Sequence, residues 1–274
     1  MKSKDRKKEK RKGIFASLTE QIKKDKRAFL VFAILRLLVI GVLVRSIFLS
    51  QWESVFTSSL TLLLLFVPSM LERGLKIEVP TTLEIITYIF VFSAEILGEI
   101  ECYYMKYPFW DTMLHTVNGF MFAAFGFALV DIFNRHGKFT FKLSPLFCAL
   151  VAFCFSMTVG VMWEFFEFGS DYLMHLDMQK DTTVYSINST YLDPAGANNV
   201  IRITDIVSTD IHTSTKTYSI DGYLDVGLYD TMADMFVNFV GAVVFSFIGY
   251  IYVKQRGRGR IAASFIPKVE PSGE

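Results

Sequence analysis

The sequence predicts an all-α polytopic membrane protein, built as a six-helix transmembrane bundle with both chain ends in the cytoplasm. Three observations support this fold class. Of the 274 residues, 52% are hydrophobic and the mean hydropathy is +0.37, which is too apolar for an ordinary soluble domain. Six apolar runs approach the length of about 20 residues that a membrane helix needs. Lysine and arginine gather in alternate connecting segments, as they do in cytoplasmic loops.

The chain opens with a basic leader, residues 1–27. Beside a hydrophobic run, such a block indicates the cytoplasmic side of a membrane rather than a nucleic-acid site, so no nucleic-acid partner is expected. Its second half, 13–27, fits either a short helix on an anionic membrane surface or a solvated segment. The first apolar run has no small-residue cleavage site after it, which predicts a retained helix and not a signal peptide.

The six predicted helices follow in order, with ends marked by proline or charge: about 28–49, 54–71, 81–102, 111–133, 145–168 and 230–253. With the N-terminus inside, the inner segments "ERGLKIEVP", "NRHGKFTFK" and "KQRGRGR" are basic, whereas the outer loops "SQWES" and "YYMKYPFW" carry one lysine between them. The positive-inside rule therefore predicts a multi-pass protein of the cell membrane, plasma or bacterial inner, surrounded by the lipid bilayer. Its transmembrane domain is 28–253, and 254–274 forms a cytoplasmic tail.

The segment between helices five and six, about 172–229, is long and polar. Its second half, "NNVIRITDIVSTDIHTSTKTYSIDGYLDVG", alternates apolar and polar residues around a polar turn. This pattern predicts a β-hairpin. The topology places this excursion on the outer, extracellular side.

Acidic side chains gather near the outer ends of helices three to six. Spacings of three and four put each set on one face of its helix. In the predicted topology, all four sets fall at one depth. This agreement is partly independent evidence, because the topology comes from lysine and arginine alone. The sets are Glu95 and Glu99; Asp111, His115 and Asn118; Glu164, Glu167 and Asp171; and Asp230, Asp234 and Asn238.

Ionisable groups at membrane depth normally face a bundle interior or a water-filled cavity. Protons, the nearby basic residues Arg45 and Lys106, or a bound cation could neutralise these carboxylates. An oxygen-rich set with one histidine suits a divalent ion, with Mg, Mn, Zn and Fe all open. The expected ligands are Asp111, His115, Glu164, Glu167, Asp230 and Asp234. In the alternative interpretation, Asp111 and Asp230 only cap their helices, and the outermost glutamates are solvated.

Four motifs, in order, resemble those of the YjdF-type inner-membrane protein family: "WDTMLHTVNGF", "WEFFEF", "MQKD" and "YDTMADMFVNFVGA". The resemblance covers about residues 110–242. Carried over, the matching positions are Asp111, His115, Gly119, Glu164, Glu167, Gln179, Asp181, Asp230, Asp234 and Gly241. It thus implies that Gln179 and Asp181 belong to the polar pocket, but the family is uncharacterised and implies no activity.

Three functions remain open. In the first, a metal-dependent enzyme acts on a lipid or lipid-linked substrate, with Glu164 and Glu167 as the catalytic carboxylates. In the second, the protein is a cation- or proton-coupled transporter. In the third, a non-catalytic scaffold uses the polar core only to hold its helices together. The sequence determines neither the substrate nor the oligomeric state.

Overall fold

The structure is a computed structural model, and it describes residues 26–75, 77–136, 143–255, 264–265 and 268–269. The chain divides into two compact units: residues 158–237 form one, and residues 1–157 with 238–274 form the other. Each unit is described by itself below. The predicted surface helix at 13–27 lies almost wholly outside the described residues.

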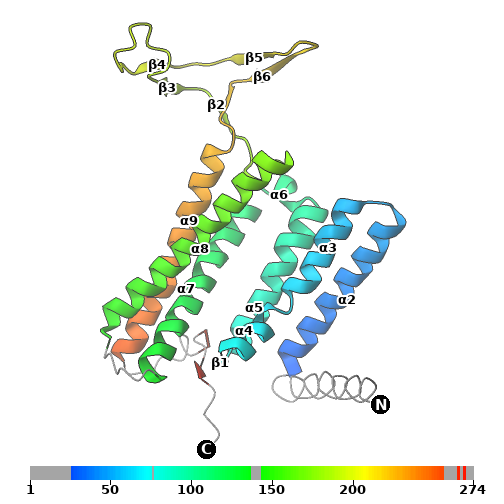
Figure 1. The fold of residues 1–274 in the computed structure, drawn as a ribbon, viewed down its shortest axis with the longest axis vertical. Helices are drawn as coiled ribbons and strands as arrows, with labels where there is room; N and C mark the ends of the chain where they lie inside the picture. Colours follow the sequence, from blue (N-terminus) through cyan, green and yellow to red (C-terminus); the bar gives the residue numbers. More distant parts are fainter. Residues whose placement is uncertain (1–25, 76, 137–142, 256–263, 266–267, 270–274) are drawn as a thin grey trace, which may run out of the picture. The chain divides into compact units, whose positions relative to one another are not determined.

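Helices dominate the described chain (Figure 1). They are α2 (Lys26–Phe48), α3 (Trp52–Leu64), α4 (Val67–Leu75), α5 (Thr81–Phe92), the π-helix η1 (Ser93–Ile100), α6 (Tyr103–Lys106), α7 (Trp110–His136), α8 (Pro145–Met174) and α9 (Leu228–Lys254). Among the described residues, five spans are long and apolar enough to cross a membrane: Lys26–Phe48, Trp52–Met70, Trp110–Val130, Pro145–Met174 and Leu228–Lys254. They correspond to five of the six predicted helices. The number six and the orientation stay predictions.

The remaining predicted helix, 81–102, is divided between α5 and η1. Phe92 and Ser93 at the junction both have right-handed helical backbone angles, so the chain continues as a helix while its hydrogen-bond register widens. At the end of η1, the Glu101 N–H donates to the Ile96 carbonyl five residues back, at 3.0 Å. π-helices are rare and arise mostly as short insertions in α-helices, which is why hydropathy alone predicts one uniform helix here.

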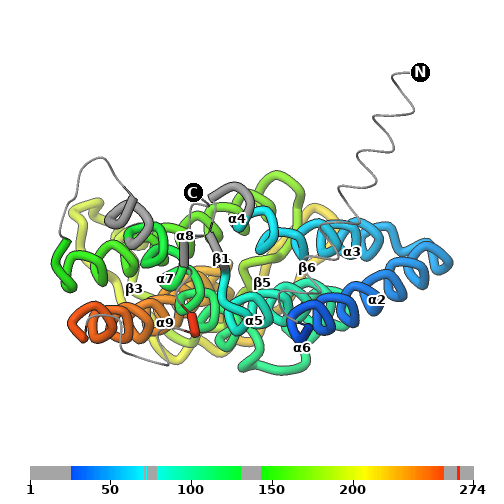
Figure 2. Tube along the Cα trace, turned by 90° about the horizontal axis from the view of Figure 1, so that it is seen from below, coloured from blue at the N-terminus to red at the C-terminus, as the bar shows by residue number. Residues whose placement is uncertain are grey.

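In the larger unit, apolar residues form two clusters. One joins α2, the end of α3, α5 and η1 around Val39, Leu65, Tyr88 and Ile96, and these helices lie alongside one another in Figure 2. The other gathers residues of α5, α7, α8 and α9 around Phe127 and Phe245. Many large apolar side chains of α2 remain exposed, as expected for a helix that faces lipid.

Two glycines bring α7 and α9 into close backbone contact. A Cβ atom on Gly119 would lie 2.1 Å from the Asn238 carbonyl oxygen, and one on Gly241 would lie 2.1 Å from the Thr116 carbonyl oxygen. Asn118 Nδ2 donates to Asn238 Oδ1 at 3.3 Å beside this contact. Small residues are what allow membrane helices to approach this closely.

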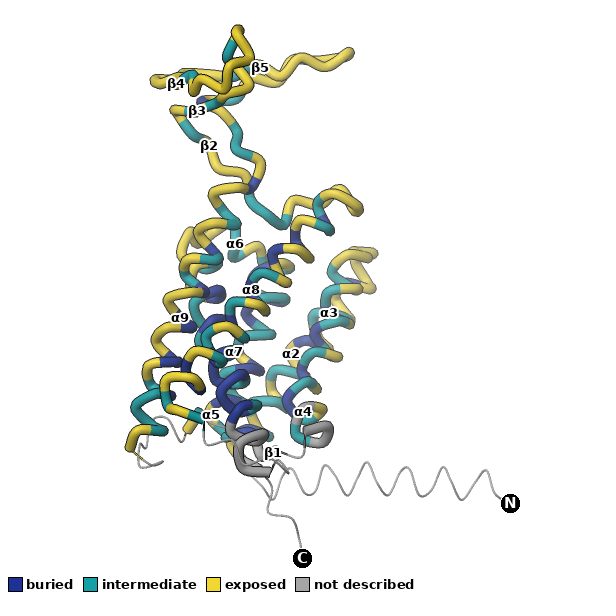
Figure 3. The backbone as a smooth tube through the Cα atoms, turned by 60° about the vertical axis from the view of Figure 1, so that its left-hand side comes forward, coloured by how far each residue is buried: buried dark blue, intermediate teal, exposed yellow. Residues whose placement is uncertain are grey.

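The smaller unit contains the predicted excursion, which forms three two-stranded antiparallel ladders. They pair β2 (Thr183–Val184) with β7 (Tyr223–Leu224), β3 (Ile187–Ser189) with β4 (Ile201–Ile203), and β5 (Ser208–His212) with β6 (Thr217–Asp221). The β5–β6 ladder confirms the predicted hairpin. Most of these residues are exposed (Figure 3).

Part of the predicted tail 254–274 packs within the larger unit. Strand β8 (Lys268–Val269) pairs with β1 (Ile77–Glu78). The ring of Phe265 contacts that of Phe120, with 5.1 Å between centroids. This end of the chain therefore contributes to the apolar core.

Candidate functional site

Three buried carboxylates lie together in the smaller unit. Glu164 and Glu167 are on α8 and Asp234 is on α9, and they are 5%, 8% and 4% exposed. Each offers a carboxylate oxygen, and these oxygens all lie within 4.8 Å of one another. The spacing of three residues turns both glutamates toward one face of α8, and α9 supplies the third oxygen. These three residues, called here the carboxylate triad, could hold a metal ion.

Neutral donors orient the two glutamates. Trp163 Nε1 donates to Glu167 Oε1 at 2.8 Å, from one turn earlier on the same helix. Gln179 Nε2 makes a long contact of 3.4 Å to Glu164 Oε2 and a short hydrogen bond of 2.6 Å to Thr231 Oγ1. Such donors satisfy carboxylate oxygens without cancelling their charge.

Two other predicted site residues bind the connecting segment after α8. Asp171 accepts the backbone N–H groups of Met178 and Gln179, at 2.6 and 2.9 Å. Asp230 Oδ2 accepts the Lys180 N–H at 2.7 Å. The structure does not place Asp171 or Asp230 in the carboxylate triad, so the expected ligand role of Asp230 stays a prediction.

The base of the excursion carries two carboxyl groups with shifted pKa values. Burial raises the pKa of Asp225, but N–H donation from Thr182, Tyr229 and Gly227 outweighs this, and the net pKa lies below its ordinary value. The pKa of Asp181 is raised by desolvation and by neighbouring acids, of which Asp177 is the first. Asp181 is exposed, and its place in the pocket stays a prediction.

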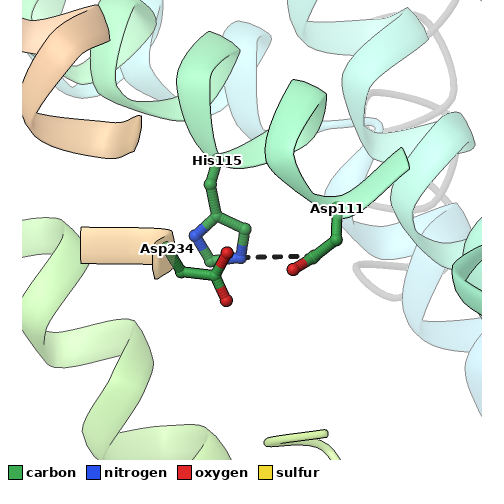
Figure 4. A group of neighbouring side chains, drawn as sticks. All are labelled: Asp111, His115 and Asp234. Carbon is green, nitrogen blue, oxygen red and sulfur yellow. Dashed lines mark ion pairs between the residues drawn. The ribbon is translucent and has the colours of Figure 1, made fainter. Parts of the chain in front are cut away.

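In the larger unit, Asp111 and His115 form a pair one turn apart on α7. His115 Nε2 lies 3.5 Å from Asp111 Oδ1, and the histidine is 8% exposed. Figure 4 draws this pair with its ion-pair contact dashed. Asn118, one turn further along, is the residue that bonds to Asn238.

Glu95 and Glu99 both lie on η1, where Glu95 is half-buried and Glu99 is exposed. Neither belongs to a group of possible metal ligands among the described residues. Arg45 and Lys106, one of three possible sources of neutralising charge for the acidic sets, contact Glu101. Arg45 Nη1 lies 3.2 Å from Glu101 Oε1, and Lys106 Nζ donates to the Glu101 carbonyl at 2.6 Å.

Sequence reasoning missed Trp163 and Thr231 as partners of the site. For Trp163, its position four residues before Glu167 was a usable signal. Thr231 had no comparable signal, because its partner Gln179 lies 52 positions away in the chain.

Comparison with known proteins places the chain in a family. Residues 30–255 match the family described as "Predicted membrane protein (DUF2238)". The chain belongs to this family. The matched range contains every motif of the YjdF-type resemblance, although that family name itself stays a prediction. The DUF2238 match shows that the chain is a member of a membrane protein family. It implies no activity.

One relative is an uncharacterised protein of Thermotoga maritima, 27% identical over 109 residues. The matched region is 40% of this chain and 54% of the relative, so the chain spans about half of that protein's length. No solved structure matches the chain.

Proposed function

We propose that this DUF2238 protein binds a divalent cation through Glu164, Glu167 and Asp234, and uses it to hydrolyse a lipid or lipid-linked substrate. The observation that carries the proposal is the carboxylate triad itself, three buried acids with oxygens within 4.8 Å of one another. Oxygen ligands of this kind suit Mg²⁺, Ca²⁺ and Mn²⁺.

Electrostatics favours a cation in such a group. At 4.8 Å and an effective dielectric constant of about 20, two ionised carboxylates repel by about 3.5 kcal/mol. Three ionised groups make three such pairs, so full ionisation is unfavourable unless positive charge enters. A divalent ion supplies that charge and attracts all three carboxylates at once.

Asp111 and His115, which the sequence also predicts as ligands, form the pair on α7 described above, and their ligand role stays a prediction from the sequence. The contact of Asn118 with Asn238 sets the register of α7 against α9.

The proposed chemistry follows from the ion and one carboxylate beside it. A bound cation would supply polarisation of a phosphoryl or ester group and activation of a water molecule. Glu164 or Glu167 accepts the proton of that water as general base. The many apolar side chains exposed on the membrane-spanning helices suit a substrate that reaches the site from the bilayer.

The first experiment measures cation binding by the purified full-length protein in detergent. Free Mn²⁺ is quantified by electron paramagnetic resonance during titration, and co-purified metals by mass spectrometry. Glu164→Gln, Glu167→Gln and Asp234→Asn should each weaken binding by more than the roughly 100-fold that changes around a metal site reach. Asp210→Asn is the matched control, because Asp210 is exposed on β5, and it should bind as the wild type does.

The second experiment separates the functions. In proteoliposomes with added phospholipids and lipid-linked phosphoesters, cation-dependent release of hydrolysis products supports the enzyme. Cation flux without hydrolysis would overturn the enzyme proposal and favour a transporter. Bound metal with neither activity would leave a structural ion, and no bound metal would overturn the proposal altogether.

A further inference from the structure

Gln179 connects the carboxylate triad to the base of the excursion. Its amide nitrogen donates to Thr231 Oγ1 at 2.6 Å and reaches Glu164 Oε2 at 3.4 Å. Both hydrogens of the amide therefore have acceptors, one on α9 and one on α8. A neutral amide in this position holds one oxygen of Glu164 and leaves its negative charge in place.

The backbone of Gln179 is held from both helices. Its own N–H donates to Asp171 Oδ2 at 2.9 Å, and the next N–H, of Lys180, donates to Asp230 Oδ2 at 2.7 Å. Charge-assisted hydrogen bonds of this kind are shorter and stronger than neutral ones. The side chain of Gln179 thus starts from a fixed point between the end of α8 and the start of α9.

Gly227 allows this close approach on the other side. Its φ of +82° favours glycine, and a Cβ atom there would lie 2.8 Å from Gln179 Cβ and 3.0 Å from the Gln179 carbonyl oxygen. A larger residue would push Gln179 away from its partners. The chain before α9 is therefore shaped to fit against Gln179.

We propose that Gln179 is a positioning residue for Glu164, which turns one carboxylate oxygen of Glu164 toward Glu167 and Asp234. This inference rests on the cation site proposed above. Residues that orient metal ligands typically change metal affinity 10- to 100-fold when they are replaced. Thr231 acts in turn on Gln179, by accepting its second hydrogen.

The test is Mn²⁺ titration of the full-length protein carrying Gln179→Leu, which removes the donor and retains similar bulk. The dissociation constant should rise about 10- to 100-fold, with no larger change in thermal stability without metal than the control shows. Gln179→Met is the second variant should the first fail to fold. Gln51→Leu is the matched control, because Gln51 is exposed before α3 and makes no side-chain cap.

A double-mutant cycle separates positioning from general packing. Thr231→Val alone should weaken Mn²⁺ binding by less than Gln179→Leu does. In the Gln179→Leu background it should change affinity by no more than about twofold, because the residue that it orients is gone. Independent, multiplying effects would overturn the inference.

The remaining outcomes distinguish the two proposals. If the wild type binds Mn²⁺ and Gln179→Leu binds it equally well, the positioning role is wrong and the cation site stands. If the wild type binds no Mn²⁺, the cation site fails, and the role of Gln179 fails with it.

Discussion

Replacing Asp234 by asparagine should stabilise the metal-free protein while removing its response to metal. The substitution retains the shape of the side chain and removes one of three charges whose oxygens lie within 4.8 Å of one another. Two repulsive pairs disappear, each of about 3.5 kcal/mol at an effective dielectric constant of about 20.

Protonation limits the gain. Without metal, the native protein can relieve the same repulsion by protonating one acid, at a cost of about 4 kcal/mol at pH 7 for a carboxyl group of ordinary pKa. The substitution also loses other contacts of the buried Asp234 side chain, which lowers the free energy of unfolding by about 1 to 2 kcal/mol. We therefore expect Asp234→Asn to raise the free energy of unfolding by about 2 kcal/mol. This corresponds to about 4–8 °C in Tm.

The assay is thermal unfolding in detergent, followed by the fluorescence of the three tryptophans, in EDTA and in excess Mn²⁺. The wild type should gain about 2.7 kcal/mol at a Mn²⁺ concentration 100 times its dissociation constant, and Asp234→Asn should gain nothing. Asp210→Asn should behave as the wild type under both conditions. A lower Tm of Asp234→Asn in EDTA, with an intact Mn²⁺ response, would refute the electrostatic reasoning.

Two further predictions concern the helix contact and the excursion. Gly119→Ala forces a Cβ atom to within 2.1 Å of a backbone oxygen on α9, so Tm should fall by about 4–8 °C, for a cost of about 2 kcal/mol. Gly41→Ala, with nothing within 4 Å of its added Cβ, should leave Tm unchanged. Asp225 has a folded-state pKa below its ordinary value. Asp225 therefore makes its full contribution to the free energy of unfolding above about pH 4, the pKa of an unfolded aspartate. This contribution is lost as pH falls through the folded-state pKa. Asp225→Asn should speed amide exchange at Thr182 and Tyr229 at pH 7, measured by hydrogen-exchange mass spectrometry; equal exchange in both proteins would contradict the anchoring role.

The helical segments and the hairpin were predictable because their signals are local. Runs of about 20 apolar residues define membrane helices, and alternating residues around "HTSTK" predicted the β5–β6 hairpin. The π-helix η1 over Ser93–Ile100 was not predicted. A change of hydrogen-bond register leaves no mark on hydropathy.

The candidate site was predictable only in part. Spacings along α8 placed Glu164 and Glu167 on one face, and the triad contains both. Asp171 and Asp230 have the same residue type and similar spacings, yet their carboxylates accept N–H groups of the segment after α8. Their partners lie 7 and 50 positions away, so helical periodicity could not separate them from metal ligands.

The sequence by itself determined that this is a helical membrane protein with acidic faces near its helix ends, because hydropathy and residue spacing are properties of each segment alone. Only the tertiary structure decided which acids meet. The rotation of α8 against α9 brings Glu164, Glu167 and Asp234 within 4.8 Å. The path of the chain through Gln179 gives the backbone N–H groups their acceptors in Asp171 and Asp230. Both depend on packing between distant segments, which no single stretch of sequence encodes.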